Sequence, residues 1–193
     1  MAYRPRILAF AGSTRKASFN KMLVKNALVG AENAGAAVTF VDLKDFPIPL
    51  YDADLEAADG IPPHALKFKE LMKSNDGFLI ASPEYNSYFS PLLKNVIDWA
   101  SRTVEGEPAY DGFEGKVAAI MAASPGALGG MRALVHLRTL LTNMRVLVLP
   151  DQKAVPNAFK VFGKDGVLTD QRTREAVEAI AFKLAHTLTK LNG

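Results

Sequence analysis

Short apolar runs alternate with longer amphipathic stretches along the whole chain. Each run is apolar at successive positions rather than at every second one, which is typical of strands that helices cover on both faces of a sheet. The pattern predicts strands over residues 7–11, 38–41, 77–81, 117–122 and 146–149. No internal repeat, low-complexity tract or linker interrupts this pattern, so we expect one domain over residues 1–193.

The amphipathic stretches predict the helices between these strands. They are expected over about residues 20–33, 62–73, 91–102 and 131–144. A last helix has the clearest apolar stripe, formed by Val177, Ile180, Ala181, Leu184, Ala185, Leu188 and Leu191. Residues 44–60 are rich in Pro and Asp and predict a loop. This loop either covers an active site or a partner, or is a plain surface loop.

Five strand–helix units of this kind predict an α/β fold with an open, doubly wound parallel sheet and helices on both faces. With right-handed crossovers, helices cover both faces only if the strand order reverses once. In the flavodoxin-like order 2-1-3-4-5, the loops after the first and third strands flank the reversal, and ligands bind there. The loops that follow Ala11 and Ala81 are therefore the expected ligand site.

The loop after the first strand, residues 12–20, places short hydroxyl side chains and two cations where a helix begins. Helix N-termini offer unpaired N–H donors to an anion, and Arg15 can add a charge-assisted contact. Both the G-x-G-x-x-G and the G-x-x-x-x-G-K-[ST] patterns are missing, so one terminal phosphate suits the loop better than a pyrophosphate or a nucleoside triphosphate. Alternatively, the loop is an ordinary helix start that Ser18 or Asn20 caps.

The loop after the third strand, residues 82–91, mixes aromatic, apolar and short polar residues. A flavin ring requires such a mixture, because its faces need flat apolar contacts and its edge needs donors and acceptors. Tyr85, Tyr88 and Phe89 could line the ring or form a partner surface. The alternative is a surface loop whose aromatic residues pack for stability, with Glu84 as a solvated acid.

The two loops together resemble the NADPH-dependent FMN reductase family, which has a flavodoxin-like fold and includes quinone, chromate and azo-dye reductases. The matching motifs are GS-x-R-x-x-S-x-N at 12–20, PEYN at 83–86 and LKN-x-IDW at 93–99. The resemblance implies that the FMN phosphate is held by Ser13, Arg15, Ser18 and Asn20. It implies that the isoalloxazine ring is lined by Pro83, Glu84, Tyr85 and Asn86. The resemblance also implies that Ser124 and Gly126 lie beside the flavin.

The chain departs from the family pattern just after the PEYN motif. The family commonly has Ser two positions and Pro four positions after the Asn of this motif, where this chain has Tyr88 and Ser90, with Pro91 one position late. We therefore expect the mouth of the ring pocket to differ from that of the family.

The glycine-bearing segment 123–130 by itself favours a tight turn. On the helix from Pro91, Lys94, Asn95, Asp98 and Trp99 are expected to pack or to form a subunit surface rather than to catalyse.

The resemblance implies an NAD(P)H-dependent oxidoreductase with FMN as its cofactor. NADPH or NADH would give hydride to the flavin, and a small-molecule acceptor (a quinone, an azo compound, chromate or free flavin) would then take two electrons. No protein side chain is assigned a catalytic role, and a homodimer or homotetramer is expected. A flavodoxin-type electron carrier is the main alternative, although such carriers are usually acidic. A receiver-like signalling module would need more acidic residues than Asp42 at the strand ends.

The composition limits which cofactors, metals and macromolecules the chain is expected to bind. The net charge is +3 and the pI is near 9.1, but Lys and Arg are scattered, which favours an anionic cofactor over a nucleic acid. The lack of Cys excludes disulfides and thiolate chemistry, and His64, His136 and His186 lack metal-ligand spacing. No apolar run is long enough for a membrane span, and the N-terminus does not resemble a signal peptide. A cytoplasmic protein is expected.

Overall fold

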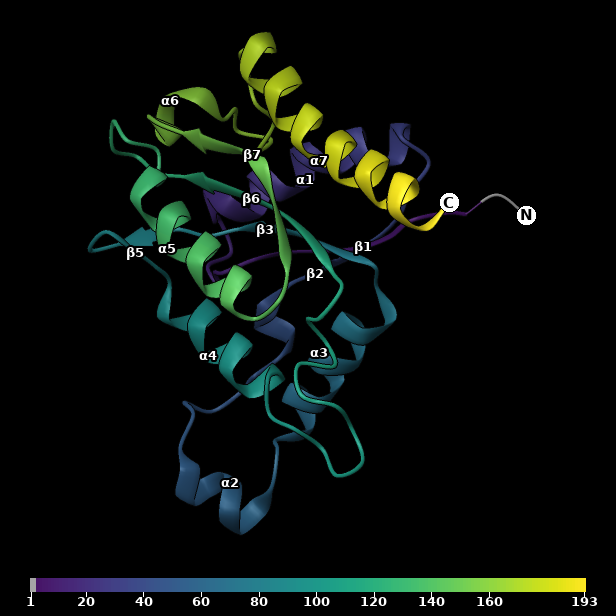
Figure 1. Ribbon diagram of the computed structural model, residues 1–193. Helices are drawn as coiled ribbons and strands as arrows, with labels where there is room; N and C mark the ends of the chain where they lie inside the picture. The colour runs from purple at the N-terminus through teal and green to yellow at the C-terminus, as the bar shows by residue number, and fades with distance from the viewer. Residues whose placement is uncertain (1–2) are drawn as a thin grey trace.

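A five-stranded parallel sheet runs through the centre of the computed structural model, which describes residues 3–193 (Figure 1). Its strands are β1 (Arg6–Ala11), β2 (Ala37–Val41), β3 (Gly77–Ala81), β6 (Val117–Ala123) and β7 (Leu147–Val155). They lie in the order β2-β1-β3-β6-β7, and every neighbouring pair is parallel. Counted along the sheet strands alone, this is the predicted order 2-1-3-4-5, so the flavodoxin-like fold is confirmed.

Alternate residues of each strand enter two separate hydrophobic cores. Ile7 and Ala9 of β1 point into one core, whereas Leu8 and Phe10 point into the other. The first core lies under α1 (Phe19–Asn33) and α7 (Gln171–Asn192). The second core lies under α3 (Pro63–Ser74), α4 (Pro91–Ala100) and α5 (Met131–Asn143). Because both faces are covered, as Figure 1 shows, every position in β3 and β6 is buried.

The last strand is longer than its apolar run predicts. Opposite Ala118 lies Val148, but opposite Ile120 lies Gln152, so the pairing with β6 shifts around Pro150. A proline has no N–H for a ladder hydrogen bond, and an edge strand with an irregularity tolerates this. The predicted end at Leu149 was therefore wrong, and β7 continues to Val155.

The segment 44–60 contains more structure than a loop. A 3-10 turn, η1 (Leu43–Asp45), overlaps its start, and α2 (Ala53–Asp59) lies within it, projecting below the sheet in Figure 1. None of the α2 residues is buried, so the sequence has no apolar periodicity there that would predict a helix. The segment is fixed to α4 because the carbonyl of Pro49 accepts hydrogen bonds from Asn95 Nδ2 (2.8 Å) and Trp99 Nε1 (2.9 Å). Packing roles for Asn95 and Trp99 are thus confirmed.

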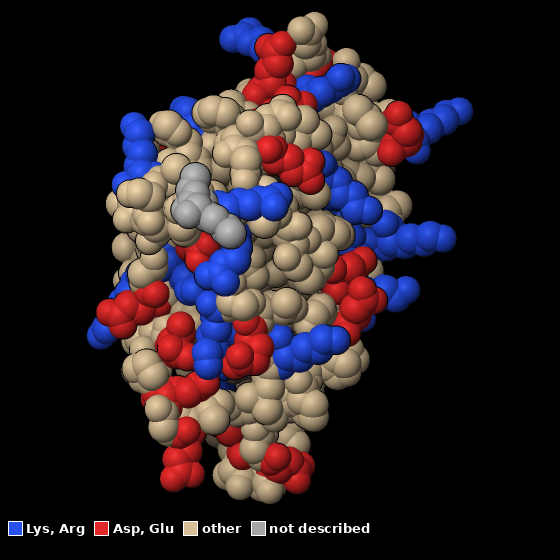
Figure 2. All heavy atoms as spheres, turned by 90° about the vertical axis from the view of Figure 1, so that its right-hand side faces the viewer, with Lys and Arg blue, Asp and Glu red and all other residues tan. Residues whose placement is uncertain are grey.

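Charged side chains of both signs are interspersed on the molecular face in Figure 2. One cluster joins elements far apart in the sequence, since Lys73 pairs with both Glu107 (2.6 Å) and Asp111 (2.9 Å). The Lys69 and Lys73 ammonium groups beside Glu107 lower the pKa of that carboxyl to about 2. Within residues 3–193, no helix has the length and apolar character needed to cross a membrane.

Ser90 joins the two site loops and caps α4. Its buried Oγ donates to the carbonyl of Gly12 (2.7 Å) and accepts from the N–H of Leu93 (3.2 Å), which makes Ser90 the N-cap of α4. A side chain at position 12 would crowd this contact, because a Cβ there would lie 2.7 Å from Ser90 Oγ. The late Pro91 is the first residue of α4, where proline is favoured.

Gly30 should be essential to the packing of α1 on α7. A Cβ at this position would lie 1.9 Å from the carbonyl oxygen of Glu178, so the two helices would have to separate. We expect Gly30→Ala to lower the free energy of unfolding by about 1–3 kcal/mol, despite the better helix propensity of Ala. Gly112→Ala is the control, since its Cβ would have only ordinary contacts, the nearest at 3.5 Å. Equal urea midpoints for the two variants would contradict the close helix contact.

Ser90→Ala should lower the free energy of unfolding by about 1–3 kcal/mol, because it removes a helix cap and leaves the buried Gly12 carbonyl without its partner. Ser74→Ala removes an exposed hydroxyl that bonds only within its own helix and should change stability by no more than about 0.5 kcal/mol. Denaturant unfolding of both variants measures the difference. If Ser90→Ala is as stable as Ser74→Ala, Ser90 does not hold the loops together.

Candidate functional site

A pocket of about 220 Å³ lies at the carboxyl ends of β1, β3 and β6. Three loops that are distant in the sequence form it, each following one of these strands. The lining residues are Ser13, Arg15, Ser18, Phe19, Asn20, Pro83, Glu84, Tyr85, Ala123, Ser124 and Pro125. This is the point at which the strand order reverses, where ligands of such sheets bind.

The structure brings together eight of the ten predicted site residues in this pocket. The other two, Asn86 and Gly126, lie outside the lining, each next to a residue that belongs to it. Sequence reasoning did not name the lining residues Phe19, Ala123 and Pro125. Each adjoins a named residue in the sequence, and this adjacency was the only signal that could have indicated them.

The start of α1 presents unpaired donors to the pocket. Ser18 caps the helix, as its buried Oγ accepts from the N–H of Lys21 (3.4 Å). The N–H groups of Phe19 and Asn20, in the first turn, have no hydrogen-bond partner within residues 3–193. Arg15 is exposed and forms no ion pair with any described residue. Capping and anion binding are thus compatible here, and the donor set suits a phosphate group.

The side chain of Asn20 is already occupied by the protein. Its Nδ2 donates to the carbonyl of Ala123 (2.9 Å), and its Oδ1 accepts from the N–H of the same residue (2.9 Å). Asn20 is buried, and this pair of hydrogen bonds holds the start of α1 against the end of β6. The backbone N–H is therefore what Asn20 has left to offer a ligand.

Glu84 is not a solvated acid, so that alternative was wrong. Its carboxylate pairs with Arg132, whose Nε lies 2.7 Å away, and it accepts weaker hydrogen bonds from the N–H groups of Arg132 (3.2 Å) and Ala133 (3.3 Å). Those N–H groups belong to the first turn of α5, where a negative charge is favourable. Glu84 thereby fixes the loop after β3 to α5 and neutralises Arg132 beside the pocket.

Beyond Glu84 the chain forms a small hairpin from β4 (Glu84–Tyr85) and β5 (Tyr88–Phe89). Its two turn residues, Asn86 (φ 51°) and Ser87 (φ 71°), are both left-handed, as such two-residue turns require. The ring of Tyr88 stacks on His136 of α5 with centroids 4.5 Å apart. The hairpin therefore leans on α5, and Asn86 shapes the turn.

The glycines after β6 are required by the protein's own backbone. A Cβ at Gly129 (φ 63°) would lie 2.7 Å from Pro156 N, and one at Gly130 (φ 89°) would lie 2.6 Å from Ala122 Cβ. These two glycines form the tight turn that the segment itself indicated. Gly126 differs, because a Cβ there would meet only Ser124 Oγ, at 3.6 Å.

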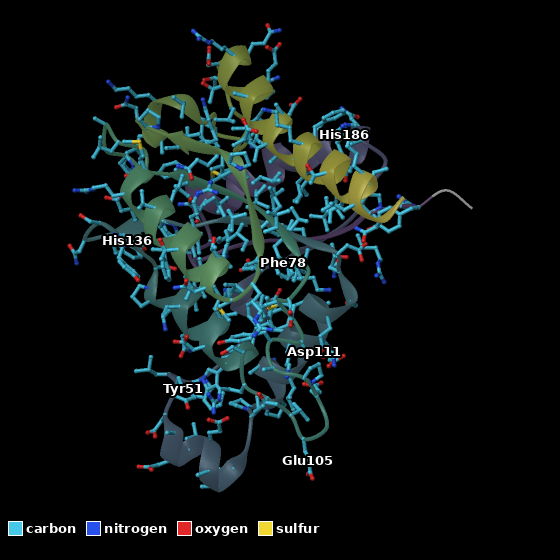
Figure 3. The ribbon with its side chains drawn as sticks, in the orientation of Figure 1. Tyr51, Phe78, Glu105, Asp111, His136 and His186 are labelled. Carbon is cyan, nitrogen blue, oxygen red and sulfur yellow. The ribbon has the colours of Figure 1, made fainter. Side chains whose placement is uncertain are left out.

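Metal-ligating side chains do not gather among the described residues, where no group of three or more His, Cys, Asp or Glu could hold an ion. Figure 3 shows His136 on α5 and His186 on α7 at opposite sides of the molecule. The pocket instead offers N–H donors, a guanidinium and flat apolar walls.

Comparisons with known proteins agree with this geometry. The family model for NADPH-dependent FMN reductases matches residues 5–160. An NAD(P)H-dependent FMN reductase of Pseudomonas aeruginosa is 35% identical over 189 residues, covering 97% of both chains. An NAD(P)H:quinone oxidoreductase of Solanum tuberosum is 34% identical over 200 residues, covering 100% of this chain and 98% of the relative.

A solved structure is similar over nearly the same length. FerB, a flavoenzyme NAD(P)H:(acceptor) oxidoreductase from Paracoccus denitrificans, superimposes with a TM-score of 0.80 at 28% identity, covering 96% of this chain and 98% of its own. The family match spans the three loops that form the pocket, and the relatives align from end to end. The chain therefore belongs to the NADPH-dependent FMN reductase family.

Proposed function

We propose that this protein binds FMN in the pocket at the strand ends and uses NADPH or NADH to reduce small acceptors, quinones foremost. The main support is the convergence of three loops on one pocket whose donors and walls suit the two ends of a flavin mononucleotide. Relatives named as FMN reductase and quinone oxidoreductase support the donor and the acceptor class. The cytoplasm is the proposed place of action, because NADPH and NADH are coenzymes of intracellular metabolism.

The residues present fit FMN at its phosphate end. We propose that the phosphate binds at the start of α1, between the free N–H groups of Phe19 and Asn20 and the guanidinium of Arg15. The hydroxyl of Ser13 adds a donor, and Ser18 contributes as the helix cap. The positive end of the helix dipole stabilises the charge of the phosphate.

The flavin ring would lie against the loops that follow β3 and β6. Pro83 and Tyr85 supply apolar and aromatic surface, while Glu84 keeps that loop in place through Arg132. Ser124, from the loop after β6, also lines the pocket. The proposal extends to Asn86 and Gly126, which adjoin the lining residues Tyr85 and Pro125.

When bound, FMN would supply the two-electron redox chemistry between the nicotinamide and the acceptor. The task of the chain is to hold the ring and leave one face accessible. The pocket volume of about 220 Å³ is below the roughly 300–1,000 Å³ usual for small-molecule sites, so one chain does not enclose the cofactor. Donor and acceptor can then use the same open side in turn.

We propose that a second copy of the chain packs beside the pocket and leaves this open side accessible. Exposed apolar residues lie on the hairpin, on the loop after β6 and on the N-terminal part of α5; they are Tyr85, Tyr88, Leu128, Met131 and Val135. The stacking of Tyr88 on His136 makes the hairpin and α5 one continuous face. Such a face on a homodimer would be buried, and it would place the partner next to the flavin.

Flavin reduction is the first test. The purified protein with added FMN should show a perturbed flavin spectrum, and anaerobic NADPH or NADH should bleach it; a quinone should then restore the colour. A protein that does not bind FMN would refute the proposal. Binding without bleaching by either nucleotide would instead identify an electron carrier.

Arg15→Ala should weaken FMN binding about tenfold or more, since a charge-assisted hydrogen bond contributes roughly 1.5–3 kcal/mol. Arg145→Ala is the matched control, because this arginine is also exposed, lies outside the pocket lining and contacts Glu114 and the Tyr110 ring. Fluorescence titration gives both dissociation constants. A change of less than about threefold for Arg15→Ala would exclude the phosphate role of Arg15.

Val135→Glu should dissociate the oligomer, because a charge in the middle of an apolar interface is costly. Leu191→Glu introduces the same charge at an exposed apolar residue near the C-terminus of α7, outside the proposed face, and should leave the oligomer intact. Light scattering after size-exclusion chromatography measures the mass of each. A monomeric unmodified protein would refute the proposed interface.

A further inference from the structure

A second pocket, of about 580 Å³, lies on the other side of the loop after β1. It shares Ser18 with the candidate flavin pocket but uses neither the loop after β3 nor the loop after β6. Its walls come from α1, the end of β2, the turn at 164–167 and the first part of α7. In Figure 1, α1 and α7 lie together on one face of the sheet.

Positive charge predominates in the lining of this pocket. Five cations, Lys16, Lys21, Lys25, Lys164 and Arg174, face three carboxylates, Asp42, Asp165 and Glu178. The other polar lining residues are Ser18 and Asn26. A pocket with this balance attracts an anion.

Several of these groups are already engaged. Lys21, which is buried, pairs with Asp42 at 2.6 Å. Burial alone would raise the pKa of Asp42, but hydrogen bonds from Lys21 and from the Lys44 N–H outweigh it and lower that pKa, so the pair is ionised and internally neutral. Asp165 accepts from the N–H of Val167 (3.0 Å) and closes a turn. Arg174 donates to the carbonyl of Leu168 (2.6 Å).

Three lysines remain available. Lys16, Lys25 and Lys164 are exposed, and none of them pairs with a carboxylate within residues 3–193. They come from the loop before α1, from α1 itself and from the turn before α7, so they surround the opening from different elements. Two carboxylates of the lining, Asp165 and Glu178, likewise form no ion pair among the described residues, so the three lysines outnumber them.

The rest of the lining is apolar and includes an aromatic ring. Met22, Val29, Phe40 and Val167 are all at least partly exposed and form this surface. The Nζ of Lys25 lies 5.3 Å from the centroid of the Phe40 ring, so a free cation and a flat apolar surface are adjacent. A flat base can pack on such a surface while a phosphate reaches the ammonium groups.

We propose that this second pocket binds a nucleoside phosphate, with the phosphate between Lys16, Lys25 and Lys164 and the base against Phe40. The site is separate from the proposed flavin site and does not depend on it. Because the two pockets meet at Ser18, the nucleoside phosphate is either a free nucleotide or the nucleotide end of a longer cofactor that extends past the first pocket. The experiment distinguishes these two sources.

ADP is the probe for a free nucleotide. Calorimetry with the full chain, with and without saturating FMN, should show one ADP bound per chain under both conditions. The double variant Lys25→Gln/Lys164→Gln should weaken ADP binding about tenfold or more, since it removes two charge-assisted contacts. Both lysines are exposed, so the fold should be retained; circular dichroism and the urea midpoint check this.

The control is Lys67→Gln/Lys190→Gln. It removes the same charge from exposed positions outside the pocket, and Lys67 also lies over a phenylalanine, with its Nζ 5.7 Å from the Phe46 ring. ADP affinity should change by no more than about twofold in this control. An equal loss in both double variants would show a non-specific charge effect and would overturn the proposal.

FAD tests the second source. If the pocket accepts the nucleotide end of a longer cofactor, the pocket variant should weaken FAD binding about tenfold and leave FMN binding unchanged. The proposal is overturned if ADP does not bind at millimolar concentration and the ratio of FAD to FMN affinity is the same in the variant and the unmodified protein. If FMN fails to bind at all, the ADP measurement still decides this proposal, whereas the proposed flavin function fails.

Discussion

Covering both faces of one parallel sheet is the constraint on which this structure depends. Strands β3 and β6 are buried at every position, so their backbone polar groups must pair within the sheet. Right-handed connections then place α1 and α7 on one face and α3, α4 and α5 on the other, with a reversal between β1 and β3. The reversal separates the loops at the strand ends and creates the candidate flavin pocket.

The loops around this pocket are held by polar groups that look, one at a time, like ligands for a cofactor. Asn20 binds both backbone groups of Ala123, Ser90 binds Gly12, and Glu84 binds the first turn of α5. Each contact satisfies a buried or helix-terminal group that would otherwise be costly to leave unpaired. The groups that remain free, namely the first-turn N–H groups of α1 and Arg15, are then presented in a fixed arrangement, which favours binding of a phosphate.

The same helix start separates the two pockets. On one side it faces the loops after β3 and β6, and on the other it faces the turn at 164–167 and the start of α7. The available lysines on the second side come from the N-terminal part of the chain (Lys16 and Lys25) and from the turn before α7 (Lys164). The packing of α1 against α7, in which Gly30 allows backbone contact, is what brings them together.

Local sequence patterns determined most of the secondary structure and the strand order of this protein. Continuous apolar runs marked the strands, and the order of strands and helices implied the reversal and hence the two site loops. Ser18, one of the two caps that the sequence offered, and Pro91 marked helix starts, because a helix end must satisfy its own N–H groups nearby and proline is favoured in a first turn. Where the apolar pattern was weak, the sequence prediction was incomplete. It missed the helix α2, which buries no residue, and it ended β7 before Pro150, although the strand continues to Val155.

Tertiary structure alone decided which polar residues are occupied and which are free. The bonds from Glu84 to Arg132 and from Asn20 to Ala123 join positions 48 and 103 residues apart. The second pocket likewise needs Lys25 and Lys164 on neighbouring elements. No local periodicity encodes such pairs, because they arise only when helices pack on the finished sheet. The sequence therefore predicted where the candidate site lies, and the packing decided which polar groups there remain free for a ligand.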